Sequence, residues 1–134
     1  MKKNINEIVI SKIENMIKSD EETAKYFIDK LHTDKLDEVC SVITNNCIIL
    51  YTFNFRLKYL KDSLNEIKYA ISHNPNVDIK ELLEDFYIGH VEELINMKFI
   101  ETNNRMYDLQ EQCKEEALKK HIQFLKTLKK NLKY

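Results

Sequence analysis

Residues 97–110 read MKFIETNNRMYDLQ, and this stretch decides which fold the sequence predicts. Two apolar and aromatic segments, 99–101 and 106–108, flank the polar residues 102–105. Asparagine tolerates the left-handed backbone of a tight two-residue turn, and β-branched and aromatic side chains pair well across a hairpin. We therefore expect a β-hairpin here, with Asn103-Asn104 as its turn, in a chain that otherwise reads as helices.

Apolar residues recur at three- and four-residue steps through most of the remaining sequence, which is the period of an amphipathic helix. The longest series predicts one helix over about 45–73 and contains Ile49, Phe53, Leu57, Leu60, Leu64, Ile67 and Ile71. Residues 51–57 also alternate like a strand, but the helical register accounts for more positions. Further helices are expected over 4–18, 20–31, 34–44, 78–97 and 110–133, with Ser19-Asp20 as the cap between the first two.

The single proline and the single glycine give two more expectations. Pro75 follows the long helix and should end it, because a residue that precedes proline disfavours the helical backbone. Gly89 lies inside the 78–97 segment. It either splits this segment into two short helices or costs about 1 kcal/mol relative to alanine within a continuous one.

Composition restricts the class of protein. A chain of 134 residues, 43% hydrophobic and 32% charged, fits one folded domain. Its apolar runs are shorter than the roughly 18 to 20 residues that a membrane-spanning helix needs. Its three cysteines form no CxxC pair, and the amino terminus does not resemble a signal peptide, so we expect reduced thiols and a cytoplasmic protein. Frequent Lys, Asn and Ile suggest an AT-rich gene, such as one from a mobile element.

The sequence contains no recognisable catalytic, cofactor-binding or metal-binding motif. The four histidines are dispersed and lack the spacing of a zinc site, and one glycine is too few for a phosphate-binding loop. His90 falls on the apolar face of the 78–97 helix and is interpreted as a hydrogen-bonded core or boundary residue. We therefore expect neither an enzyme nor a protein that carries a cofactor or metal.

Residues 90–119, HVEELINMKFIETNNRMYDLQEQCKEEALK, resemble the winged-helix signature of many bacterial regulators. In those proteins a recognition helix is followed by a strand, a short wing and a second strand, which would be 99–101 and 107–109 here. The bracketing long helices are similar to those of MarR- and PadR-type regulators and TubR-type centromere-binding proteins. The resemblance covers about residues 78–122. It implies a mainly α fold with one small hairpin, in which a helical segment, 1–44, precedes a winged-helix core, 45–134, with a carboxy-terminal amphipathic helix.

The resemblance implies a dimer that binds double-stranded DNA, either as a transcriptional repressor or as a plasmid or phage partition adaptor. The helix-turn-helix would be 78–87 with 90–98 or, as we prefer, 63–73 with 78–98, joined through Pro75. The residues expected at the DNA are Arg105, Asn103, Asn104, Lys98, Lys80, Asn76 and Lys68. The apolar seams of helices 45–73 and 110–133 would form the homodimer.

The charge distribution supports an alternative function. Residues 78–98 carry six acidic and two basic side chains, whereas residues 114–134 carry seven lysines and two glutamates. An acidic recognition helix would repel DNA phosphates. The alternative is a small helical interaction module from a mobile element that binds or inhibits a basic, nucleic-acid-binding protein. Its acidic surface would contain Glu84, Asp85, Glu92 and Glu93.

Overall fold

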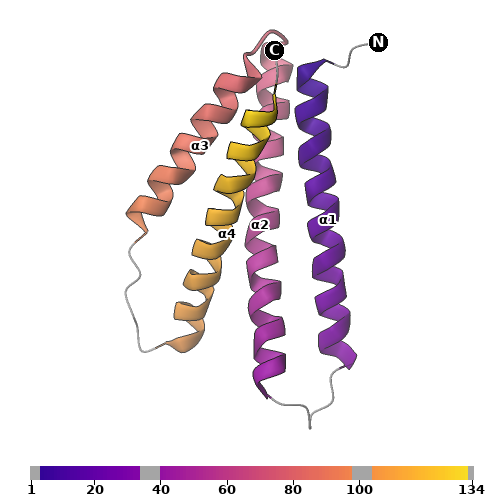
Figure 1. Ribbon diagram of the computed structural model, residues 1–134, viewed down its shortest axis with the longest axis vertical. Helices are drawn as coiled ribbons and strands as arrows, with labels where there is room; N and C mark the ends of the chain where they lie inside the picture. The colour runs from indigo at the N-terminus through magenta and orange to yellow at the C-terminus, as the bar shows by residue number, and fades with distance from the viewer. Residues whose placement is uncertain (1–3, 34–39, 98–103, 133–134) are drawn as a thin grey trace.

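The computed structural model describes residues 4–33, 40–97 and 104–132, and almost all of these residues are helical. The four helices of this part of the chain are α1 (Ile5–Thr33), α2 (Cys40–His73), α3 (Ile79–Asn96) and α4 (Arg105–Asn131). Successive helices run in opposite directions, so that α2 and α4 point the same way (Figure 1). The helix α4 packs against both α2 and α3, while α1 packs against α2 on its other side.

The expected β-hairpin is wrong, because its second half is the start of a helix. Asn104 is the N-cap of α4, and its side-chain oxygen accepts a hydrogen bond from the backbone N–H of Tyr107 at 3.1 Å. The expected second strand, 107–109, is therefore helical, whereas the first, 99–101, lies outside the described residues. Asparagine suits a helix N-cap as well as a tight turn. Here the helix N-cap is favoured over the turn, because the helical conformation lets Leu109, which is half-buried, continue the apolar face of α4.

The winged-helix core predicted over 45–134 is wrong for the same reason, since no described residue forms a strand. The mainly α class agrees with the structure. The long helix expected over 45–73 is confirmed: α2 begins earlier, at Cys40, and ends at His73, shortly before Pro75. Of the two possibilities for Gly89, the continuous helix is correct, because α3 runs unbroken from Ile79 to Asn96.

The amino-terminal segment also differs from the prediction. One helix of 29 residues replaces the two expected over 4–18 and 20–31. Asp20 is not a cap: its side chain is buried and faces Arg56 of α2, with 3.2 Å between the carboxylate Oδ2 and the guanidinium Nε. Burial raises the pKa of the Asp20 carboxyl, and the Arg56 charge opposes that rise. The ion pair therefore fixes α1 against α2 at the position where the sequence suggested a break.

The hydrophobic core lies where α1, α2, α4 and the start of α3 converge. Its largest cluster contains Val9, Ile13, Ile17, Leu60, Leu64, Ile67, Ile79, Leu83, Leu125, Leu128 and Leu132. A second cluster, Tyr59 with Ala117 and Leu118, joins α2 to α4 nearby. The buried α2 members of both clusters begin at Tyr59, and the partly buried Phe55 and Leu57 pack against them. The described residues of α2 before Phe55 belong to neither cluster.

Candidate interaction surfaces

A polar cluster lies inside the bundle between α2, α3 and α4. The Ser63 Oγ and the His121 Nε2 are 3.1 Å apart and buried. The Tyr59 hydroxyl donates a hydrogen bond to Glu93 Oε1 at 3.3 Å, and the His90 Nδ1 lies 3.3 Å from the other oxygen of the same carboxylate. The rings of His121 and Tyr59 stack with their centroids 5.6 Å apart. The expectation that His90 is a hydrogen-bonded core or boundary residue is thus confirmed.

Burial shifts the pKa values of two residues in this cluster, His121 and Tyr59. It lowers the pKa of His121 to about 3, with help from the neighbouring His90 and from Arg56. Burial and the Glu93 carboxylate raise the pKa of the Tyr59 phenol above its usual value. Among the described residues, no three His, Cys, Asp or Glu side chains are grouped closely enough to hold a metal ion. The cluster therefore joins three helices through polar contacts and stacked rings.

The outer face of α3 exposes both carboxylates and apolar side chains. Its residues follow one another at steps of four and three, so they share one side of the helix. They are Glu81, Asp85, Ile88, Glu92 and Ile95, called the α3 stripe below, and all five are exposed. Ile88 and Ile95 have exposed fractions of 45% and 73%. The inner side of α3 contains Ile79 and Leu83, which are buried in the core.

The acidic surface predicted from the sequence is divided between these two sides. Asp85 and Glu92 belong to the exposed stripe. Glu84 instead forms an ion pair with Lys129 of α4, and Glu93 binds the polar cluster through Tyr59. Two of the four carboxylates therefore hold α3 against its neighbours, and two remain available to a partner.

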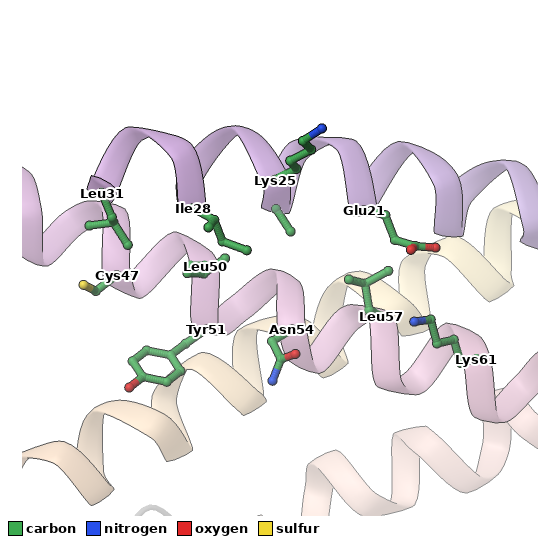
Figure 2. A pocket seen from close by; sticks show the side chains of 11 residues that line it. Glu21, Lys25, Ile28, Leu31, Cys47, Leu50, Tyr51, Asn54, Leu57 and Lys61 are labelled. Carbon is green, nitrogen blue, oxygen red and sulfur yellow. The ribbon is translucent and has the colours of Figure 1, made fainter. Parts of the chain in front are cut away.

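A groove that encloses about 650 Å³ runs between α1 and α2 (Figure 2). Its apolar lining comes from both helices: Ala24, Ile28 and Leu31 of α1, and Leu50, Tyr51 and Leu57 of α2. Figure 2 shows Ile28, Leu50 and Leu57 between the two ribbons. From Cys47 to Lys61 the α2 side of the groove is roughly 21 Å long, at 1.5 Å per helical residue.

This groove lies on the side of α2 opposite α4. Tyr59 and Ser63, which contact His121 of α4, are each two residues from a groove-lining residue, Leu57 or Lys61. Two residues correspond to about 200° around a helix. The packing of α4 therefore leaves the groove uncovered.

Polar residues mark the middle and one end of the groove. Asn54 lies midway along the α2 lining, while Glu21 of α1 and Lys61 of α2 stand at the same end (Figure 2). Lys25 of α1 also lines the groove, and Figure 2 shows its amine pointing away from α2. A second hollow of about 470 Å³ shares Glu21 and Lys61 and continues to Glu14 and Leu64. The depression thus follows the α1–α2 pair over much of its length.

The structure does not bring the predicted DNA-binding residues together. Lys80 lies in the first turn of α3, Asn76 lies in the turn just before that helix, and Lys68 lies near the end of α2 that leads to it. Arg105 and Asn104 stand at the start of α4, beyond the other end of α3 (Figure 1). The 18 residues of α3 separate the two groups by roughly 27 Å at 1.5 Å per residue. Lys98 and Asn103 lie outside the described residues.

Comparisons with protein-family models, with curated proteins and with solved structures found no match. None of the helices in the described ranges is both long and apolar enough to cross a membrane. The exposed surfaces of the described residues are therefore the basis for the function proposed below.

Proposed function

We propose that this chain is a protein-interaction module that binds a basic, amphipathic segment of another protein through the α3 stripe. The observation that carries the proposal is the exposure of Ile88, which lies between the exposed carboxylates Asp85 and Glu92, and of Ile95, which follows Glu92 on the same side of the helix. Large apolar side chains grouped at a surface and surrounded by charge are typical of interaction sites. A partner with apolar residues between lysines or arginines would match both features.

The charge of the α3 stripe supports a basic partner over a second copy of α3. Two copies would place carboxylates against carboxylates, which is unfavourable. A basic segment would pair with Glu81, Asp85 and Glu92 while its apolar residues cover the isoleucines. Such segments occur on nucleic-acid-binding proteins, whose surfaces carry clustered lysine and arginine. Binding of the α3 stripe to such a segment would compete with binding of the nucleic acid to the same segment.

DNA binding by this chain stays a prediction from its sequence. The expected β-hairpin, which was the main support for that prediction, is not found in the described residues. The described start of α4 replaces the expected second wing strand, and the exposed side of α3 is acidic, which repels phosphates. A cytoplasmic location also stays a prediction, which the free thiols Cys47 and Cys113 would suit.

The proposal can be tested with a labelled three-heptad helical peptide that has leucine at its seam and lysine beside it. We expect fluorescence anisotropy to show binding that weakens with salt. Reversing Asp85 and Glu92 to lysine should weaken it roughly tenfold or more, because two attractive contacts become repulsive. Ile95→Ser should weaken it through lost apolar contact.

Two controls separate the α3 stripe from net charge. The double variant Glu22→Lys and Glu116→Lys reverses two exposed carboxylates on α1 and α4, changes the net charge equally, and should retain most of the affinity. A peptide with glutamate in place of lysine should not bind. Equal binding of both peptides, or equal losses in both double variants, would contradict the proposal.

Glu93 is excluded from these variants because it binds Tyr59 inside the bundle.

A further inference from the structure

The first half of α2 has an inverted pattern of burial. Between residues 46 and 57 the only buried residues are polar, Asn46 and Thr52, whereas the apolar side chains are all partly exposed. These apolar residues are Cys47, Ile48, Ile49, Leu50, Tyr51, Phe53, Phe55 and Leu57. A helix that is apolar on every side is normally covered on every side. Here α1 and α4 cover two sides, and the side with the groove remains bare.

The two walls of the groove have the spacing of a coiled-coil seam. Residues 21, 24, 28 and 31 of α1 and residues 47, 50, 54, 57 and 61 of α2 follow one another at steps of three and four. The walls run antiparallel, and together they resemble half of a four-helix bundle. A second antiparallel helix pair would complete that bundle.

We propose that the groove is occupied by the same groove of a second copy of this chain, in a dimer whose two-fold axis runs parallel to α1 and α2. In this arrangement each α1 packs against α2 of the other copy, and all neighbouring helices of the four-helix bundle are antiparallel. The partly exposed side chains Ile28, Leu50 and Leu57 of both copies then form a shared core.

The charges at the end of the groove support this occupant and this axis. Glu21 and Lys61 stand at the same end but on different walls. The parallel axis brings Glu21 of each copy close to Lys61 of the other, so the contact forms twice and is self-complementary. An axis perpendicular to the helices would instead place these charges against the apolar end of the groove, near Leu31. That arrangement would leave them without partners.

Asn54 adds a second argument for the same axis. It is the polar residue midway along the apolar α2 wall. The parallel axis places the two copies of Asn54 at the same level, where their amides can hydrogen-bond to each other. A single polar residue within an apolar seam commonly fixes the register and the number of helices in such a bundle.

The dimer does not require the surface proposed for the basic partner. The groove faces away from α4, whereas α3 packs on α4, so both α3 stripes would stay accessible in the dimer. One dimer could then hold two basic segments at once, which increases apparent affinity through effective concentration.

The test uses two charge reversals that are complementary only across the dimer. Light scattering after size-exclusion chromatography should show a dimer for the original chain. Glu21→Lys alone places lysine beside lysine at both contacts, and Lys61→Glu alone places glutamate beside glutamate. Each variant should therefore dimerise roughly tenfold or more weakly. Mixing the two variants should restore a dimer that contains one copy of each, because both contacts again join opposite charges.

Glu22→Lys and Lys58→Glu are matched controls. Both residues are exposed and lie close in sequence to Glu21 and Lys61, but neither lines the groove. They should leave dimerisation nearly unchanged. A monomeric original chain at high concentration would overturn the proposal, as would single reversals that dimerise normally. A mixture of the two variants that stays monomeric would overturn it as well. The peptide titration of the α3 stripe is a separate readout and can succeed or fail independently.

Discussion

The two halves of α2 are both rich in apolar residues but have different surroundings. From Tyr59 to Ile67 the buried apolar residues include Leu60 and Ile67, with exposed fractions of 2% and 0%. From Cys47 to Leu57 the apolar side chains are only partly covered. The helix α2 has 34 residues and α3 only 18, so α3 contributes to the core only beside the second half. The comparison shows that an apolar period indicates how much surface a helix must bury, while the neighbouring helices decide how much of it is covered.

The largest expected effect is a difference in unfolding free energy between the two halves. Ile67→Ala should lower it by about 3 kcal/mol, because a fully buried isoleucine leaves a cavity. Leu50→Ala should cost less than about 1 kcal/mol in the monomer, since its side chain is already partly hydrated. Urea denaturation of dilute samples measures both values. Equal losses would mean that the first half of α2 is as well covered as the second.

A smaller effect should appear as a dependence of stability on pH. Burial holds the pKa of His121 at about 3, below its ordinary value of 6.5, so the unfolded chain binds the proton more readily. Stability should therefore be fully present above pH 6.5 and should fall as the pH decreases toward 3, by at most about 1.4 kcal/mol per pH unit from this group.

His121→Gln removes this titration and should flatten the pH dependence between pH 6 and 4 in urea denaturation. His73→Gln serves as the control, because His73 is exposed at the end of α2. If the unfolding free energy of His121→Gln had the same pH dependence as that of the original chain, protonation of His121 would not be the cause of that dependence.

The smallest expected effect is a gain at Gly89. A Cβ atom built there meets nothing within 4 Å, and the residue has no positive φ. Gly89→Ala should therefore stabilise the protein by roughly 0.5–1 kcal/mol, since glycine loses more backbone entropy in a helix. Thermal unfolding followed by circular dichroism measures the gain. A loss of stability would indicate that α3 needs flexibility at this position.

The helices could be predicted from the sequence where one pattern dominated. The seam of α2 and its end before Pro75 were clear, whereas the sequence left open whether α3 runs through Gly89. Asn104 was ambiguous, because the same side chain can complete a turn or cap a helix. Asp20 misled for a similar reason: aspartate is a common N-cap, but here Arg56 compensates its burial within a helix. Local propensity cannot distinguish these cases.

The candidate sites were less predictable than the helices. The sequence revealed the acidic composition of α3, but it could not show that Glu84 and Glu93 contact residues of neighbouring helices. The polar cluster was missed, although His121 lies four residues from both Ala117 and Leu125 on the apolar face of α4. That spacing was the available signal. The only indication of the groove between α1 and α2 in the sequence was the high apolar content of the first half of α2.

By itself, the sequence determined that the chain is mainly helical, where α2 ends, and that α3 is acidic, because these properties depend on residues close together along the chain. The tertiary structure alone decided which side of each helix is covered. It paired Asp20 with Arg56, placed His121 beside Ser63, and left the groove next to Leu50 open. These outcomes depend on the lengths and positions of helices that are far apart in the sequence. Patterns of residues close together along the chain do not predict them.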